Sequence, residues 1–435
     1  MTNIFLLKRM PHNLFGLIAC LFFFQVISYG QPTNLANYDY NYSTNIQTVI
    51  IRPYGSVVGF PMTYLNSGRQ LELLFDDLDG DFVFYKYRIV QCDANWNPSQ
   101  LSEIEYLQGF NDQEIRDYAY STNTRVNYTT YHLVFPNDLL GVTKSGNYLI
   151  HVYKDNDNEP ALTRRFVVSE QVFNIGAMLT SDLRAGKTLE NQRIDLTLNP
   201  TMRIPDPMSQ VRVAILKNGI WNTRPLLTPK YIRNEELSFD YLDEVSFPGG
   251  KEFRYVDIRS VRRPSYKIEN LERFNNRTEV FLRTESLEGN AAYSSYPDLG
   301  GSYLIQNLDR PDADDECDYF LVHFYLNAPN KLASPVYVLG QFNEWGHRDD
   351  IEPMTYVPEK KYYTTSILLK QGYYDYYYAE KTNKGFDARI TEGNSFETSN
   401  IYQIIAYYRA YGERWDRVAQ FWSLGTPVSG ALRED

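Results

Sequence analysis

Side chains that could perform catalysis are few and scattered in this chain of 435 residues. His132 and His151 both fall within predicted strands, where a hydrogen-bonded structural role is expected for a histidine. The sequence contains no metalloprotease, nucleophile-elbow, phosphate-loop, Cys-x-x-Cys or dinucleotide-binding motif. We therefore expect no catalytic residue and no cofactor, and we predict that the protein is not an enzyme.

One acidic segment has the spacing of a metal-binding loop. Asp77, Asp79 and Asp81 alternate like the first ligands of a calcium loop. However, the glycine that should follow the third aspartate is missing, and so is the distal glutamate. Gly80 lies where a hairpin turn needs a glycine. We expect a solvated turn of a hairpin here, with no metal bound.

Trp345 is the residue whose type most suggests ligand binding. An exposed indole stacks on the apolar face of a pyranose ring, which makes a sugar the candidate ligand. The other interpretation is that Trp345 caps a hydrophobic core and binds nothing. The strands that surround Trp345 bear on this choice.

The segment 335–379 predicts these strands. Two valines alternate on a first strand, which ends in the turn that holds Trp345. Three tyrosines share one face of a later strand, because side chains alternate with period two. They are Tyr374, Tyr376 and Tyr378. This pattern is typical of a β-sandwich, and the segment resembles the early-set, glycogen-binding-like family of carbohydrate-binding modules.

In the resembled modules, two tryptophans, a lysine and an asparagine form the sugar site. Trp345 matches one tryptophan, and Asn400 matches the asparagine. Tyr377 stands where the lysine is expected, and Phe386 stands where the second tryptophan is expected. The resemblance implies, as an alternative function, a periplasmic glycan-binding protein that uses the Trp345 face. Loss of the lysine removes a hydrogen-bond donor to sugar hydroxyls, which weakens this implication.

Strand-forming residues dominate the composition, with 37 Tyr and 24 Phe, and amphipathic helical periodicity is hard to find. Short apolar runs alternate with turns, as in immunoglobulin-like sandwiches. We predict an all-β protein of tandem immunoglobulin-like or early-set β-sandwich domains. The predicted divisions are a signal peptide at 1–30, an N-terminal β-sandwich domain at 31–170, a middle β domain at 171–315, an early-set, carbohydrate-binding-like β-sandwich at 316–425 and a polar tail at 426–435.

The N-terminus has the pattern of an export signal. Lys8 and Arg9 precede an apolar run at 14–27, and Ser28-Tyr29-Gly30 has the small-x-small form that a signal peptidase needs. A lipoprotein box at Cys20 is the rival interpretation, but apolar and aromatic residues follow this cysteine where polar ones are expected. No later run reaches the about 18 apolar residues of a membrane helix. We predict a periplasmic protein without direct membrane insertion.

Net charge and cysteine content narrow the set of partners. Removing the two basic residues of 1–30 changes the net charge from −11 to −13, because this segment has no acidic residue. An acidic surface disfavours nucleic acid as a partner. Cys92 and Cys317 remain after cleavage and fall in different predicted domains, so we expect two buried thiols rather than a disulfide.

Several further segments occur in order along the chain. They are FDDLDGDFVFYKYRIVQCDANW at 75–96, LQGFND at 107–112, SGNYLIHVY at 145–153, RRFVV at 164–168, ETSN at 397–400 and YYRAYGERWDR at 407–417. Together they resemble the type IX secretion system plug protein family, over about residues 40–417. The resemblance implies a periplasmic β-sandwich protein that plugs the periplasmic opening of a giant outer-membrane β-barrel translocon. Such a plug seals the channel when no substrate is exported.

A plug needs a surface that fits its partner, and a few Tyr, Trp and Arg side chains usually carry most of the energy of an interface. The sequence offers such residues in the loop at 92–98 and in the C-terminal run. The predicted partner-binding residues are Trp96, Arg409, Arg414, Trp415 and Arg417. Each could instead belong to the core or protect a sheet edge, and the arginines are the least easily buried of the set.

Overall fold

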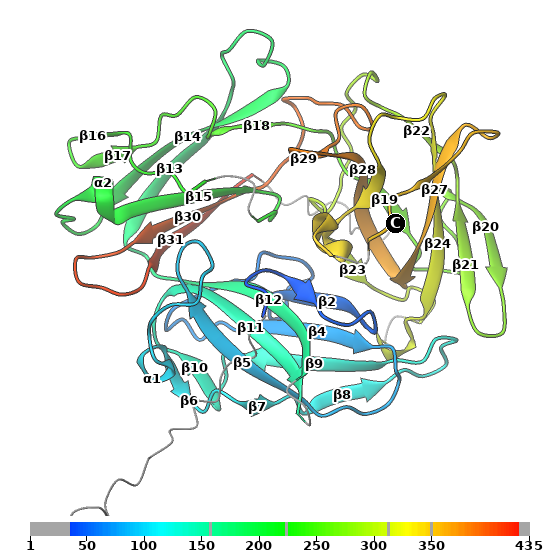
Figure 1. Cartoon of the computed structure of the whole chain (residues 1–435), viewed down its shortest axis with the longest axis horizontal. Helices are drawn as coiled ribbons and strands as arrows, with labels where there is room; N and C mark the ends of the chain where they lie inside the picture. The colour runs from blue at the N-terminus through cyan, green and yellow to red at the C-terminus, as the bar shows by residue number, and fades with distance from the viewer. Residues whose placement is uncertain (1–34, 156–158, 222–224, 311–313, 349–350, 426–435) are drawn as a thin grey trace, which may run out of the picture. The chain divides into compact units, whose positions relative to one another are not determined.

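The computed structural model describes residues 35–155, 159–221, 225–310, 314–348 and 351–425. Strands make up 47% of the structure and helices 4%, which confirms the predicted all-β class. Contacts join Ala36–Asp435 into one compact unit, whose strands form several sheets (Figure 1). The predicted signal peptide at 1–30 and the polar tail at 426–435 lie outside the described residues.

The first pair of sheets encloses a core built from the early part of the chain. One sheet contains β2 (Ile46–Pro53), β4 (Leu71–Asp77), β9 (Thr129–Phe135) and β8 (Asp117–Tyr120). The facing strands are β5 (Tyr85–Cys92), β7 (Gln113–Glu114), β11 (Gly146–Lys154), β12 (Glu159–Ser169), β1 (Tyr40–Asn41) and β3 (Met62–Tyr64). Period-two alternation directs Leu71, Leu73 and Phe75 into this core with Ile89 and Ile150. The short strands β6 (Leu107–Gly109) and β10 (Leu140–Val142) pair with each other beside it.

Strands from much later in the chain complete the sheet that contains β11 and β12. They are β31 (Arg417–Leu424), β30 (Tyr402–Tyr408) and β15 (Val211–Lys217). β12 and β31 pair in parallel at Ser169 and Val418, and β30 pairs antiparallel with β15 (Figure 1). The beginning, the middle and the end of the described chain therefore share one nine-stranded sheet.

A five-stranded sheet packs on this late part of the nine-stranded sheet. Its strands are β13 (Phe173–Ser181), β14 (Asn191–Pro200), β16 (Tyr231–Arg233), β17 (Glu236–Ser238) and β18 (Ser246–Pro248). Leu196 of β14, Val213 of β15 and Ile404 of β30 are all buried in the second core between these layers. The side chains of β30 thus complete a core whose facing strands, β13 and β14, lie some two hundred residues earlier in the chain.

The third core lies between two further sheets. The larger sheet contains β20 (Ile268–Arg273), β21 (Thr278–Leu282), β22 (Glu285–Ser286), β24 (Tyr319–Asn327), β27 (Tyr362–Lys370) and β26 (Thr355–Val357). The other contains β19 (Arg254–Asp257), β23 (Tyr303–Ile305), β25 (Val336–Leu339), β28 (Gly372–Thr382) and β29 (Gly385–Asp387). Tyr374, Tyr376 and Tyr378 of β28 are buried together in this core, as their spacing predicts.

Helical segments are short throughout the described ranges. They are α1 (Glu103–Tyr106), α2 (Pro207–Gln210) and the 3₁₀ turns η1 (Asp314–Glu316) and η2 (Gln341–Gly346). In the part of the chain that the structure describes, no helix has the length and apolar character needed to cross a bilayer.

Strands from the predicted middle domain at 171–315 are divided between the second and third cores. β15 pairs with β30, whereas β19 and β23 pair with β28. Contacts do not divide Ala36–Asp435 into smaller units. The boundaries near 170 and 315 therefore stay predictions.

The hairpin predicted around the turn at 77–81 is wrong. β4 pairs with β2 and β9, whereas β5 pairs with β11 and β7, so the two strands lie in different sheets. Asp77 supports this crossing, because its carboxylate accepts hydrogen bonds from Tyr85 OH at 2.8 Å and from Asp79 N at 3.0 Å. The expected solvated turn is also wrong at Asp77, whose side chain is buried.

A buried ion pair joins the first core to the third. Lys370 Nζ of β27 lies 2.7 Å from Asp76 Oδ2 of β4, and both side chains are buried. Tyr319 OH donates to the same carboxylate oxygen at 2.6 Å, and Lys370 lies 4.0 Å from the ring centroid of Tyr128. Because breaking a buried pair leaves an uncompensated charge, this contact holds the two cores to each other.

The two cysteines lie in separate places, as predicted. Both are buried, and they form no disulfide among the described residues. Cys92 ends β5, whereas Cys317 follows η1 and its carbonyl accepts a hydrogen bond from Tyr128 OH at 2.8 Å. Burial raises the pKa of the Cys92 thiol, which keeps it protonated and unreactive at neutral pH.

Candidate functional site

Two segments that the sequence predicts as contact sites lie side by side. The loop at 93–98 follows β5 and holds Trp96, and the loop at 409–416 joins β30 to β31. Asp416 links the two loops, since its Oδ2 accepts a hydrogen bond from Ala94 N at 2.8 Å. The same carboxylate receives Arg409 Nε and Nη2, each at 2.7 Å. We call these two loops, together with Arg417, the loop pair.

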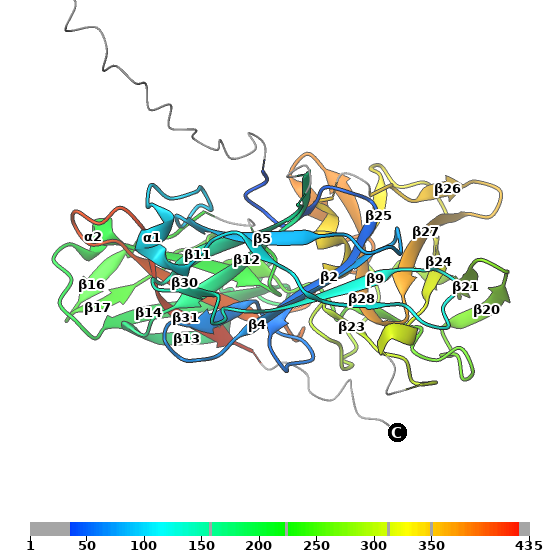
Figure 2. The same ribbon diagram turned by 90° about the horizontal axis from the view of Figure 1, so that it is seen from below.

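Arg414 is the most exposed of the three predicted arginines. Its side chain is 53% exposed, against 44% for Arg409 and 32% for Arg417. Arg414 pairs with Glu105 of α1 and donates from Nη1 to Gln100 O at 3.3 Å. These contacts hold the β30–β31 loop beside α1 (Figure 2).

Trp415 lies close to two cations. Lys144 Nζ is 4.2 Å and the Arg417 guanidinium is 5.2 Å from its ring centroids, which is the range of cation–π attraction. Arg417 in turn is held by Glu413, with Nε 3.0 Å from Oε2. The indole Nε1 of Trp415 is buried and has no hydrogen-bond partner among the described residues. The loop therefore contains one unsatisfied donor.

Trp96 is buried in this structure, as expected for the alternative in which this residue belongs to a core. Its ring packs edge-on against Trp221 with centroids 4.8 Å apart. The guanidinium of Arg165 lies 5.5 Å from the Trp96 ring and 5.1 Å from the Trp221 ring. Trp96 thus supports Trp221 and Arg165 from within, and it offers little surface for direct contact.

Exposed apolar side chains occur on the loop pair and in the segments that adjoin α1. Tyr411 belongs to the C-terminal run that the sequence predicts, whereas sequence analysis missed Ile104, Phe110 and Leu139. Ile104 of α1 is 89% exposed, next to the Glu105 that pairs with Arg414. Asn111 Nδ2 donates to Glu103 Oε1 at 2.7 Å, which holds the turn after Phe110 beside α1. The available sequence signal was an isoleucine placed between two glutamates, where burial is not expected.

Trp345 forms part of a wall rather than an open platform. It is 9% exposed, and its ring packs on Phe253 and Tyr377 with centroids 5.7 and 6.0 Å away. Gly301 allows this close packing, because a Cβ at Gly301 would lie 2.2 Å from Trp345 Cη2. Only part of the indole is therefore available to a ligand.

Asn400 is a buried structural residue. Its Nδ2 donates to Gln192 Oε1 at 2.9 Å and to Gly249 O at 2.8 Å, while its Oδ1 accepts from Asn218 Nδ2 at 2.8 Å. Asn400 does not line the cavity that Trp345 lines. The structure therefore does not bring the two residues of the glycan hypothesis into one site.

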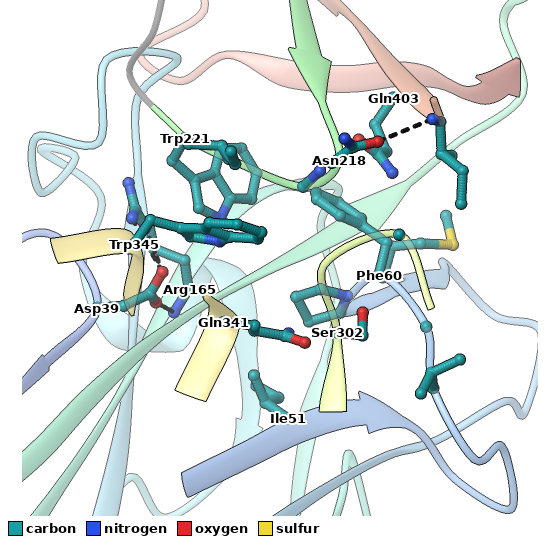
Figure 3. Close-up of a pocket in the computed structure, with 18 of the residues that line it drawn as sticks. Asp39, Ile51, Phe60, Arg165, Asn218, Trp221, Ser302, Gln341, Trp345 and Gln403 are labelled. Atoms are coloured by element: carbon teal, nitrogen blue, oxygen red, sulfur yellow. Dashed lines mark hydrogen bonds and ion pairs between the residues drawn. The ribbon is translucent and has the colours of Figure 1, made fainter. Parts of the chain in front are cut away.

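The cavity beside Trp345 has a volume of about 510 Å³. It lies where the strands of the first, second and third cores meet. Trp221, Trp345 and Phe60 supply aromatic walls, and Gln341 and Ser302 lie below these three rings in the view of Figure 3. The lining residues fall within 39–62, 164–165, 218–221, 299–302, 341–347 and 401–423. Sequence analysis identified one lining residue, Trp345, because the others are distant in the chain.

The histidines in strands are hydrogen-bonded, as predicted. His132 Nδ1 lies 3.0 Å from Asp117 Oδ2, and His151 Nδ1 lies 2.7 Å from Thr163 Oγ1. Burial, with a smaller contribution from the charge of Arg88, lowers the pKa of His151 to about 4. Across the described ranges, no three His, Cys, Asp or Glu side chains are grouped so that they could hold a metal ion.

Comparisons with known proteins agree with this architecture. The model of the type 9 secretion system plug protein 1st domain matches residues 46–170, the stretch from β2 to β12. A crystal structure of a hypothetical protein from Parabacteroides merdae ATCC 43184 is similar, with 30% identity and a TM-score of 0.84 over 90% of this chain and 100% of that chain. The C-terminal domain of the Streptococcus pyogenes antigen I/II-family protein AspA also matches, at 7% identity, but its TM-score of 0.16 carries no argument. No curated protein sequence matches.

The fold defines a protein of packed β-sandwiches. The match identifies residues 46–170 as the first domain of the type IX secretion system plug protein family, and it supports this family for the chain. This family is a secretion-system family and not an enzyme family. Membership implies a role in type IX secretion, in association with that system at the cell envelope.

Proposed function

We propose that this protein is a non-enzymatic subunit that plugs the periplasmic opening of the giant outer-membrane β-barrel translocon of the type IX secretion system. In this role it seals the channel when no substrate is exported, and it resides in the periplasm in association with the translocon. The observation that carries the proposal is the family match over 46–170, which covers the strands of the first core.

Rigid connection of the three cores supports this role, because a plug has to keep its shape while it blocks an opening. The first and second cores share the nine-stranded sheet, so they cannot separate without breaking the β12–β31 pairing. The first and third cores share the buried Lys370–Asp76 pair. Rigid-body contact of this kind avoids the cost of ordering a flexible segment on binding.

We assign the contact with the translocon to the loop pair and the exposed apolar residues around it. Exposed apolar side chains beside arginines give the composition that interface centres favour. Ile104, Phe110 and Tyr411 supply the apolar part, and Arg414 supplies the most exposed charge.

A charge reversal at this surface tests the assignment. The Arg414→Glu, Ile104→Asp double variant places two acidic groups where an apolar and basic contact is proposed. It should lose at least tenfold of the translocon recovered by pulldown in mild detergent, because it removes a contact and adds a like charge beside Glu105. A strain that expresses it should also take up large antibiotics more readily whenever the translocon channel is otherwise open.

The matched control is Arg389→Glu, Ile390→Asp, which changes an exposed Arg and an exposed Ile in the segment after β29, beside Gly289. This control should retain the wild-type pulldown. If both double variants bind equally well, the contact lies elsewhere. If the wild-type protein recovers no outer-membrane partner at all, the plug proposal itself fails.

The glycan-binding alternative has less support. Trp345 is mostly covered by Phe253 and Tyr377, and Asn400 uses its amide in contacts with Gln192, Gly249 and Asn218. Binding of the folded protein to a glycan array, lost on replacement of Trp345, would reverse this preference.

A further inference from the structure

The cavity beside Trp345 has no part in the proposed sealing role or in the loop pair, and its lining suggests a separate binding site. Its walls are largely apolar and aromatic, and Phe60 packs on Trp221 and Phe421 with centroids 5.2 and 5.3 Å apart. Ile51 and Met62 extend the apolar lining. A volume of about 510 Å³ falls within the range of about 300–1,000 Å³ that is usual for ligand pockets.

The charged residues of the lining neutralise one another. Arg165 donates from Nε and Nη2 to Asp39 Oδ2 at 3.1 and 2.9 Å. Arg164 Nη2 lies 2.6 Å from Glu344 Oε1. Because both ion pairs form within the protein, they offer no net charge to a ligand, and the cavity suits an uncharged one.

Several neutral polar groups of the lining remain available. The side chains of Gln341, Ser302 and Ser423 make no hydrogen bond with any described residue. Gln403 accepts a hydrogen bond from Gly219 N at 2.9 Å through Oε1, which leaves its side-chain NH₂ group available as a donor. An amide that both donates and accepts matches the N–H and C=O of a peptide backbone.

The same inventory disfavours a sugar. Each hydroxyl of a buried sugar needs a partner, since an unsatisfied polar group in an apolar site is costly. The available partners in this lining are two amides and two hydroxyls, among walls that are mostly apolar. An aromatic side chain next to one or two peptide groups would contact the apolar walls with its ring and the amides and hydroxyls with its peptide groups.

The walls are fixed before any ligand arrives. The Arg165 guanidinium lies between its Asp39 partner and the rings of Trp96 and Trp221. Glu344 anchors η2, which carries Trp345, to β12 through Arg164. A preformed pocket limits the ordering cost of binding.

We propose that this cavity is an anchor site for an aromatic side chain carried by an extended, uncharged segment of a partner polypeptide. The ring enters between Trp345 and Phe60, and Gln341 bonds the adjoining peptide group. This proposal does not depend on the sealing role or on the loop-pair surface. It can therefore fail while the proposed function holds, and the reverse is also true.

Fluorine NMR of the full protein labelled with 5-fluorotryptophan tests the proposal. The sequence has five tryptophans, two of which line the cavity, and Trp415→Phe and Trp422→Phe variants assign two of the remaining signals. The probe is the tripeptide N-acetyl-Gly-Phe-Gly-amide. The signals of Trp221 and Trp345 should shift with a dissociation constant of about 1 mM, as expected for one anchored side chain, while those of Trp415 and Trp422 stay in place.

Two comparison ligands decide the chemical class. N-acetyl-Gly-Ala-Gly-amide should leave all five signals unchanged, because it lacks the ring. If maltose shifts the Trp345 signal and the phenylalanine peptide does not, the site binds glycans and the proposal is overturned. If neither ligand moves the Trp221 and Trp345 signals at about ten times the expected dissociation constant, the proposal is also overturned.

A pair of variants tests the peptide contact. Gln341→Ala removes an exposed amide at the cavity and should weaken binding of the phenylalanine peptide about fivefold, the effect of one neutral hydrogen bond. Gln108→Ala removes an equally exposed amide on β6 and should bind like the wild-type protein. Unchanged tryptophan signals in the free variants confirm that both are folded. Equal affinity in both variants would overturn the assignment of Gln341 to the peptide backbone, and with it the proposal.

Discussion

The ion pair between Lys370 and Asp76 links strands that are 294 residues apart in the sequence. Replacing Lys370 with Met keeps most of the apolar stem but leaves the Asp76 charge buried without its cation. We expect the free energy of unfolding to fall by about 3–5 kcal/mol, as for other broken buried pairs. Urea denaturation followed by circular dichroism measures this change.

Arg116→Met provides the control, because Arg116 pairs with Glu114 at an exposed position. Its urea midpoint should match that of the wild-type protein, since surface ion pairs contribute little. Equal loss of stability in the two variants would show that Lys370 does not act through its buried partner.

His151 gives the protein a predictable sensitivity to acid. Burial lowers its pKa from 6.5 to about 4 in the folded protein. Between these values the unfolded chain binds more protons than the folded one, so stability falls as pH is lowered from 6.5 to 4, by about 3 kcal/mol. His151→Gln does not titrate, and its urea midpoint should therefore fall less between pH 7 and pH 4. Parallel acid losses in the two proteins would contradict this assignment.

Residue type was a good guide to exposure for two of the predicted contact arginines but not for Trp96. Arg409 and Arg414 remain exposed, as their charge predicts, whereas Trp96 is buried under Arg165. The cavity was not predictable, because Phe60, Trp221 and Trp345 become neighbours only after three sets of strands have packed. Ile104 was not predictable by periodicity, since α1 is a single turn and has no face to read.

Within single elements, local pattern was informative. Alternation correctly predicted the buried tyrosines of β28. It failed at the connection from β4 to β5, because a turn sequence fixes the reversal of the chain but not the sheet that the next strand joins. Nothing in the sequence distinguishes Asp77, which is buried at that crossing, from the neighbouring aspartates.

Close packing at η2 predicts a strong effect of one methyl group. Gly301 has a φ of +83°, and a Cβ there would lie 2.2 Å from Trp345. Gly301→Ala should therefore lower the free energy of unfolding by about 3 kcal/mol or more, through backbone strain and the displacement of Trp345. Thermal unfolding followed by tryptophan fluorescence measures both the stability and the movement of the indole.

Gly55→Ala separates these two causes. Gly55 has a similar φ of +78°, but a Cβ there would meet no atom within 4 Å. It should cost only the strain of a left-handed backbone, about 1 kcal/mol. Similar losses in the two alanine variants would mean that Trp345 yields easily, in which case the cavity is not preformed.

At the scale of the whole molecule, sequence analysis correctly predicted an all-β chain but could not identify the sheet partners. β30 lies nearly two hundred residues beyond β15, and no local feature of either strand specifies the other. Apolar strands buried on one face are interchangeable by composition, so long-range pairing is decided by packing.

Truncation tests how strongly the last strands hold the molecule together. A chain that ends at residue 400 lacks β30 and β31, and it should be degraded or insoluble because the second core loses one wall. A chain that ends at residue 425 keeps every strand of the described structure and should have wild-type solubility and unfolding temperature. Limited proteolysis and calorimetry compare the two. A stable, protease-resistant chain ending at 400 would contradict this view of the nine-stranded sheet.

The late arrival of β30 and β31 also imposes an order on biogenesis. A polypeptide that emerges N-terminus first presents one edge of β15 before β30, the strand that will cover this edge, has been made. Unpaired strand edges favour association with other chains. Until residue 408 has emerged, the newly made protein therefore keeps an unpaired edge of β15 that favours such association.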